Sequence, residues 1–304
     1  MAREETGHLG LAGPAFAVAA YTIWGVMPAY WKALAEIPPP EILANRVVWS
    51  LLFTLAVLVG LGRLREVREV LRDPRRRLAL LASGVLIAVN WGIFIWAVSV
   101  GRLVEASFGY YLNPLVNVAL GVLLLGERLR RPQQIAIGIA ALGVIVLGVG
   151  SGAAPWLPLS LAASFGLYGL VRKLTPVSSL SGLTVETALL TPLSLGYLLV
   201  LAYTGEGHLG AAGLRTNALL VFSGVVTALP LIWFASAAKR LSFSTLGLFQ
   251  YLAPTLSFLL AVAVYDEPFT PVRAFAFGCI WMAIALYTAD SVRASAWPVA
   301  DAGT

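Results

Sequence analysis

The chain has 304 residues, of which 59% are hydrophobic and only 12% are charged, whereas an ordinary soluble domain carries roughly 25% charged residues. So few charges could not cover so much apolar surface in water, so a bilayer is expected to solvate the outside of the protein. The net charge of +6 could indicate nucleic-acid binding, but the basic residues lie in short gaps between apolar runs. We therefore expect the lipid bilayer as a partner and no nucleic acid.

Ten apolar stretches follow one another along the chain, each of about 20 residues and long enough to cross a bilayer as a helix. The first stretch follows a charged N-terminal segment and has full helix length, so we interpret it as a permanent span and not as a cleaved signal. The stretches fall at residues 11–34, 42–61, 78–99, 104–125, 132–150, 153–171, 182–203, 216–238, 243–264 and 272–290.

The longest hydrophilic segment, residues 62–77, lies between the second and third spans. Its apolar residues recur at helical spacing among arginines: they are Leu64, Val67, Val70 and Leu71. This pattern predicts a short amphipathic helix on an anionic leaflet. A regulatory or nucleic-acid role is the alternative, which the shortness of the basic run disfavours.

Lys and Arg residues alternate between the two sides of this arrangement. With the N-terminus in the cytoplasm, sixteen fall in cytoplasmic segments and four in outer segments, with Arg46 inside a span. This asymmetry is typical of the positive-inside rule. It predicts a multi-pass protein of the plasma (inner) membrane with both termini in the cytoplasm.

The fourth and ninth spans contain similar motifs. Tyr-Leu-Asn-Pro at 111–114 matches Tyr-Leu-Ala-Pro at 251–254, and at the same offset of 140 residues Glu127 falls on Glu267. Short matches between apolar helices arise by chance, but several at one offset indicate a repeat of five helices. Because five is odd, the second copy has inverted topology. We expect one half at 1–150, a second at 151–291 and a cytoplasmic tail at 292–304.

Arg46 lies about one turn into the second span, beside Asn45. A buried arginine needs an anionic partner from the protein or from a substrate, so Arg46 is a candidate for substrate binding. The alternative is an arginine whose side chain extends to the membrane surface.

Glu186 lies in the seventh span. A carboxylate held in an apolar setting takes up a proton more readily than one in water, so Glu186 is a candidate for proton coupling. Two alternatives stay open: a structural pair with a basic residue such as Arg172 or Lys173, or an interfacial carboxylate.

Polar residues also surround two matching prolines. Pro114 and Pro254 remove backbone donors and free carbonyls one turn earlier, and kinks at matching points of both halves favour a binding site at the midplane. Their alternative role is to shape the helices. The candidate residues are Tyr110, Tyr111, Asn113, Gln250 and Tyr251.

Aromatic residues near the span centres could line a cavity for an amphipathic or aromatic solute. These candidates are Trp24, Trp91 with the neighbouring Asn90, and Tyr168. The alternative is an interfacial belt, which we prefer for Trp96 and Trp233.

Enzyme signatures are absent from the sequence. There is no glycine-rich phosphate loop with a lysine, and the two histidines, His8 and His208, with the single Cys279, do not form a metal-binding set. We expect no cofactor, no metal and no enzymatic activity. The glutamates Glu127 and Glu267 are interpreted as structural, paired with arginines such as Arg128 or Arg273.

Several motifs together resemble the RarD-type permeases of the EamA branch of the drug/metabolite transporter superfamily, over about residues 10–290. They are Ser-Phe-Gly-Leu-Tyr-Gly-Leu-Val-Arg-Lys at 164–173, Gly-Leu at 182–183, Glu-Thr at 186–187, Phe-Gly-Tyr-Tyr-Leu-Asn-Pro at 108–114 and Gln-Tyr-Leu-Ala-Pro at 250–254. The resemblance implies an all-α plasma-membrane transporter of ten transmembrane helices, built as two inverted five-helix EamA repeats. It implies no settled substrate.

We therefore expect a secondary transporter that moves a small metabolite or drug-like solute by alternating access. The alternatives are a facilitator or a carrier-lipid flippase, which a lateral opening would distinguish, and a membrane scaffold with a filled core. Intramembrane polar residues disfavour the scaffold, which has little reason to carry their cost. A monomer is compatible with the sequence, which leaves the oligomeric state open.

Overall fold

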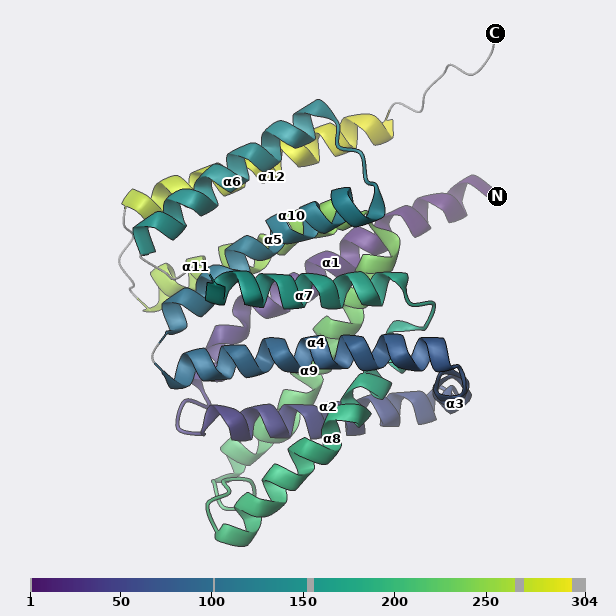
Figure 1. Cartoon of the computed structure of the whole chain (residues 1–304), viewed down its shortest axis with the longest axis vertical. Helices are drawn as coiled ribbons and strands as arrows, with labels where there is room; N and C mark the ends of the chain where they lie inside the picture. Colours follow the sequence, from purple (N-terminus) through teal and green to yellow (C-terminus); the bar gives the residue numbers. More distant parts are fainter. Residues whose placement is uncertain (1, 101, 152–155, 266–270, 297–304) are drawn as a thin grey trace.

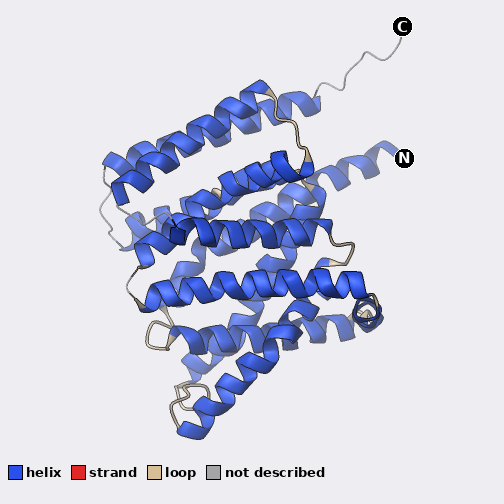
Figure 2. Cartoon of the chain, in the orientation of Figure 1, coloured by secondary structure: helices blue, strands red, loops and turns tan. Residues whose placement is uncertain are grey.

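The computed structural model describes residues 2–100, 102–151, 156–265 and 271–296, and this part of the chain is helical with no strand. Short loops connect the helices (Figure 2). The helices are α1 (Ala2–Lys32), α2 (Pro39–Gly60), α3 (Leu64–Arg72), α4 (Pro74–Ser99), α5 (Leu103–Leu125), α6 (Arg131–Ser151), α7 (Trp156–Leu174), α8 (Ser179–Thr204), α9 (Leu214–Arg240), α10 (Phe243–Gln250), α11 (Leu252–Tyr265) and α12 (Pro271–Ala296).

Eight helical segments among the described residues are long and apolar enough to cross a membrane. They lie in α2, α4, α5, α6, α8, α9, the α10–α11 pair and α12. The expectation of an all-helical, multi-pass membrane protein is therefore confirmed. Helix α7 falls outside this set because Arg172 and Lys173 occupy its last turn and lower its hydropathy.

The helices lie side by side as a bundle (Figure 1). Helices α6 and α12 pack together at one edge, α2 and α8 pack together at the other, and α1, α5, α7, α9 and α10 fill the middle. The start of α1, the end of α12 and helix α3 lie along the same side of the view. We call this side the α3 end of the bundle.

An aromatic core holds the middle helices together. Tyr21, Tyr168, Phe234 and Phe243 come from α1, α7, α9 and α10, and all four are buried. The rings of Tyr168 and Phe234 stack with centroids 6.1 Å apart. Aromatic pairs of this kind add directional packing to the burial of apolar area, so this core fixes how α7 sits on α9.

The ninth predicted span is divided in the structure. Helix α10 ends at Gln250 and α11 begins at Leu252, with Tyr251 in a turn between them. Pro254 lacks a backbone N–H and therefore leaves the carbonyl of residue 250 without its helical partner. Helix α5, by contrast, continues without a break through Pro114.

Helix α3 is the amphipathic helix expected between the second and third spans. Val70 is buried and packs, with Val67, in a cluster with Leu80, Val177 and Val185. Leu64 and Leu71 are exposed. The apolar side of α3 is therefore divided between contact with the bundle and a part left free to contact lipid.

Glu66 fastens α3 to the start of α8. Its carboxylate accepts hydrogen bonds from Arg63 at 2.5 Å, from Ser181 at 2.7 Å and from Ser178 at 2.9 Å. The Arg63 guanidinium, with smaller contributions from both hydroxyl groups, lowers the pKa of Glu66 to about 2. Because this pKa lies below the usual value of 4.5, the attachment is fully present above pH 4.5 and is lost only as the pH falls toward 2.

Glu127 has a structural role, as expected, but with a different partner. Its carboxylate accepts hydrogen bonds from the backbone N–H groups of Phe243 and Ser244 and from the Ser244 hydroxyl, at 2.5, 2.9 and 2.7 Å. These groups lie in the first turn of α10, so Glu127 caps the N-terminus of that helix instead of pairing with Arg128. The corresponding Glu267 lies outside the described residues.

Candidate functional site

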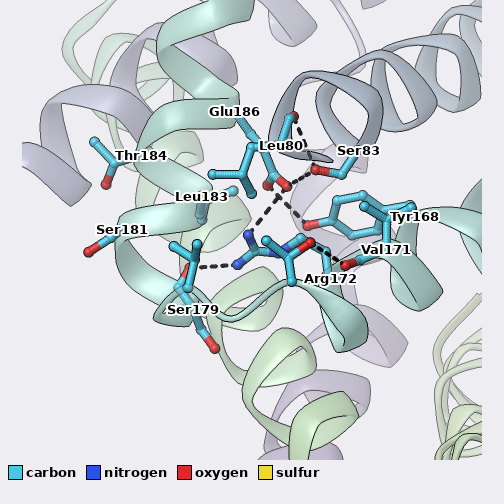
Figure 3. A network of polar contacts seen from close by, with 12 residues as sticks. Leu80, Ser83, Tyr168, Val171, Arg172, Ser179, Ser181, Leu183, Thr184 and Glu186 are labelled. Carbon is cyan, nitrogen blue, oxygen red and sulfur yellow. Dashed lines mark hydrogen bonds and ion pairs between the residues drawn. The ribbon is translucent and has the colours of Figure 1, made fainter. Parts of the chain in front are cut away.

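Glu186 lies in a buried polar network that joins α4, α7 and α8 (Figure 3). The side chains of Glu186 and Arg172 are each 1% exposed, and they form an ion pair in which Nη1 is 3.5 Å from Oε1. Ser83 donates a hydrogen bond to Oε1 at 2.5 Å, and Tyr168 donates one to Oε2 at 3.4 Å. The pair with Arg172 is the structural partner that the sequence offered as an alternative.

Arg172 reaches this position through a gap left by a glycine. A Cβ atom added at Gly182 would lie 1.8 Å from Nη1 of Arg172. Nη2 donates to the backbone carbonyl of Ser179 at 3.0 Å, whereas Nε and Nη1 are buried without a hydrogen-bond partner. The ion pair with Glu186 therefore offsets most of the free energy that it costs to remove this guanidinium from water.

Two lysines close the same end of the bundle. Lys173 at the end of α7 donates to the carbonyl groups of Ala238 at 2.8 Å and Leu241 at 2.5 Å. Lys239 at the end of α9 donates to the carbonyl group of Thr175 at 3.0 Å. Each lysine thus compensates the negative end of the other helix. We refer to these lysines and the Glu186 network together as the α3-end latch.

A cavity of about 330 Å³ lies directly outside the latch. Its polar lining includes Arg63, Ser178, Ser179, Ser236, Lys239 and Arg240. Ser179, whose carbonyl group accepts from Arg172, belongs to both the cavity and the latch. The cavity therefore reaches the outer surface of the latch.

Arg46 lies in a second cluster, away from the latch. Its guanidinium carbon is 4.7 Å from the ring centroid of Trp91 and 5.2 Å from that of Trp31. Its Nε donates to the Thr227 hydroxyl at 3.1 Å. Tyr110 is close enough to interact with Arg46 electrostatically, and its side chain is 50% exposed. We call these five residues the Arg46 cluster.

The proline region contributes a hydrogen bond that sequence reasoning missed. Asn117 in α5 donates to Gln250 in α10 at 2.7 Å, and both side chains are buried. The side-chain oxygens of Asn117 and Asn113 are buried without a partner. Asn117 lies one helical turn after Asn113 and so shares its face, which was the available signal.

The other candidates have packing environments of their own. Asn90 donates to the Leu161 carbonyl at 2.8 Å and to the Ser164 hydroxyl at 3.0 Å, which joins α4 to α7. Trp24 packs in the aromatic core. Tyr111 and Tyr251 pack in the cluster formed by α6 and α12.

The structure thus groups the candidates into separate sets. Arg46, Trp91 and Tyr110 come together in the Arg46 cluster. Tyr168 and Glu186 come together in the latch, and Gln250 pairs with Asn117. These contacts place the candidates in separate sets, and their role in substrate binding stays a prediction.

Comparisons with known proteins agree on one family. The model of the EamA-like transporter family matches residues 11–149. The chain is 47% identical to an uncharacterized transporter of Vibrio cholerae, over 93% of both chains. It is 44% identical to the uncharacterized transporter YojE of Bacillus subtilis, over 92% of this chain and 95% of that protein. It is 42% identical to protein RarD of Escherichia coli, again over 92% and 95%.

A solved structure described only as "Crystal structure of protein" has the same fold. The TM-score is 0.71 with 21% sequence identity, over 94% of this chain and 98% of the other. At this identity the likeness concerns the fold alone.

Proposed function

This chain belongs to the EamA-like transporter family and is a multi-pass membrane transporter, and we propose that it moves a small metabolite or drug-like solute across the plasma membrane by alternating access. In that mechanism, two halves rock around a central site that opens to one side and then to the other. The proposal includes ten spans, with α1 and α7 added to the eight segments that are apolar enough on their own.

The packing partners of the helices support two inverted halves. Helix α1 packs on α9 and α11, whereas α7 packs on α4 and α5. Suppose that α1 corresponds to α7, α4 to α9, and α5 to the α10–α11 pair. The contacts of α1 with α9 and α11 then correspond to the contacts of α7 with α4 and α5. Exchanging the two halves leaves three further contacts unchanged, because each joins a helix to its counterpart in the other half: α2–α8, α5–α10 and α6–α12. This exchange is the pattern expected for halves at 1–150 and 151–291 related by a pseudo-two-fold axis.

The contrast between the two clusters carries the proposal of alternating access. Ser83 in the latch and Trp91 in the Arg46 cluster both lie on α4, eight residues or about 12 Å apart. The Glu186–Arg172 pair of the latch is buried, whereas Tyr110 in the Arg46 cluster is half exposed. This contrast supports a transporter that is closed at the α3 end and open at the other. The basic residues of α3 favour the cytoplasm for the closed end.

Opening the α3 end requires Glu186 and Arg172 to separate, because they join α8 to α7. Protonation of Glu186 would remove its charge and weaken the pair. We therefore propose Glu186 as the group that couples a proton gradient to this opening.

Glu186→Gln in proteoliposomes is expected to abolish the dependence of solute flux on a pH gradient, because glutamine cannot exchange a proton. A metabolite-wide comparison of uptake and efflux between deletion and overexpressing cells would supply the solute to be measured. Glu69→Gln is the matched control, since Glu69 is an exposed carboxylate of α3 that pairs with Arg65. Unchanged gradient-driven flux in Glu186→Gln would contradict the coupling role.

A further inference from the structure

Arg46 carries a charge that no acidic residue of the described structure neutralises. Its polar contacts are a hydrogen bond from Nε to a neutral hydroxyl group and two tryptophan rings. Its side chain is partly buried within a membrane-spanning helix. A lone cation in such a place favours the binding of an anion, because an unpaired charge is costly in an apolar setting.

The nearest glutamate along the same helix is already occupied. Glu41 is buried, accepts a hydrogen bond from the backbone N–H of His208 at 2.8 Å, and contacts Nδ1 of His208 at 2.7 Å. Among the described acidic residues, none forms an ion pair with Arg46. The described acidic residues therefore leave the charge of Arg46 available to an anion that the protein binds.

The surroundings of Arg46 leave its terminal nitrogens free for a ligand. Thr227 holds Nε, while the rings of Trp31 and Trp91 lie within cation–π distance of the guanidinium. The two Nη atoms make no hydrogen bond to the described residues and are not among the fully buried polar atoms. Two parallel N–H groups in this position match the two oxygens of a carboxylate.

We propose that Arg46 binds the carboxylate of a monoanionic solute whose flat apolar part lies against Trp91 and Tyr110. A single negative charge balances the single positive charge of the site. The half-exposed Tyr110 ring, whose centroid is 6.2 Å from that of Phe94, offers an aromatic surface beside the cation. This inference rests on the proposed transport function, for which it names the substrate class.

The test compares aromatic acids with their neutral amides on the purified full-length protein in detergent. The probes are benzoate, phenylacetate and indole-3-acetate, each paired with benzamide, phenylacetamide or indole-3-acetamide, and binding is measured as a rise in the thermal unfolding midpoint. At least one acid is expected to stabilise the protein with an affinity tenfold or more above that of its amide. If no acid binds better than its amide, the proposal is overturned.

Variants then locate the charge that is recognised. Arg46→Gln should remove the preference for the acid, and Arg46→Lys should keep part of it, since lysine retains the charge without the two parallel donors. Arg102→Gln is the matched control, because Arg102 also lies within cation–π distance of a tryptophan, Trp156, at 5.8 Å. If Arg46→Gln keeps the preference, or Arg102→Gln loses it, the assignment to Arg46 is wrong. If Arg46→Gln does not fold, the partial loss of preference expected for Arg46→Lys tests the assignment instead.

Failure of this inference can be separated from failure of the transport mechanism. Alternating access is measured independently by cysteine reactivity at the two ends of the bundle, without any solute. If reactivity exchanges between the ends but no acid is preferred, only the substrate class is wrong. If acids bind through Arg46 but the ends do not exchange, the binding site stands and alternating access fails.

Discussion

Arg172→Gln is expected to destabilise the protein by about 3–5 kcal/mol, the usual cost of removing one partner of a buried ion pair. Glu186 would keep only the hydroxyl groups of Ser83 and Tyr168 as hydrogen-bond donors. The measurement is the thermal unfolding midpoint of the purified protein in detergent, followed by size-exclusion chromatography. Arg240→Gln is the control at the same end, because Arg240 is exposed and donates to a carbonyl group of its own helix.

The double variant Arg172→Gln with Glu186→Gln should recover much of this loss. Two neutral amides can bond to each other and leave no uncompensated charge, so the two single effects should not add. Additive losses would show that the two side chains do not act as a pair. A midpoint for Arg172→Gln equal to that of the unmodified protein would show that the latch contributes nothing to stability.

Gly224→Ala is expected to disrupt the crossing of α2 and α9. A Cβ atom at this position would lie 2.3 Å from the backbone carbonyl carbon of Trp49 and 2.6 Å from the backbone N of Ser50. Because backbone atoms cannot move aside by changing a rotamer, the two helices must separate. We expect a loss of about 3 kcal/mol, at the upper end for an overpacked core, and a fall in the recovery of monodisperse protein.

Gly196→Ala provides the matched control in another long helix. Its added Cβ would meet no atom within 4 Å. The higher helix propensity of alanine is then the remaining effect, and it should stabilise the folded protein by about 0.5–1 kcal/mol. The two glycine substitutions should therefore shift the unfolding midpoint in opposite directions. Equal shifts would mean that the tight contact at Gly224 does not hold these helices.

The sequence predicts the helices well because lipid imposes a simple requirement of about 20 apolar residues per span. It also predicts α3, since Val67 and Val70 recur at helical spacing among arginines. The break at Tyr251 could not be predicted, because the similar Tyr-Leu-Asn-Pro motif in α5 stays helical through Pro114. Whether a helix kinks or breaks at a proline depends on the helices packed against it, and a single sequence does not show which helices those are.

The candidate site is less predictable than the fold. Arg46 and Glu186 stand out because charges within apolar runs are rare. The proline motif groups Tyr110 with Tyr111, yet neighbouring helical residues point about 100° apart, and the structure places them in different clusters. Whether Glu186 pairs with Arg172 or with Lys173 depends on the space that Gly182 leaves, which only the structure reveals.

Cysteine reactivity at the two ends tests alternating access most directly. Cys279→Ser removes the single native cysteine, and one new cysteine is then placed either at Tyr110 or at Ile87, which is buried one turn beyond Ser83. A membrane-impermeant maleimide is applied to vesicles of both orientations. In the unmodified latch, only Tyr110→Cys should react.

Weakening the latch with Glu186→Gln alone, which removes the carboxylate charge that pairs with Arg172, should reverse this pattern. Ile87→Cys is then expected to react from the α3 side, while Tyr110→Cys becomes protected from the other. If both cysteines become reactive together, or if neither changes, the two ends do not open in alternation and the proposed mechanism is contradicted.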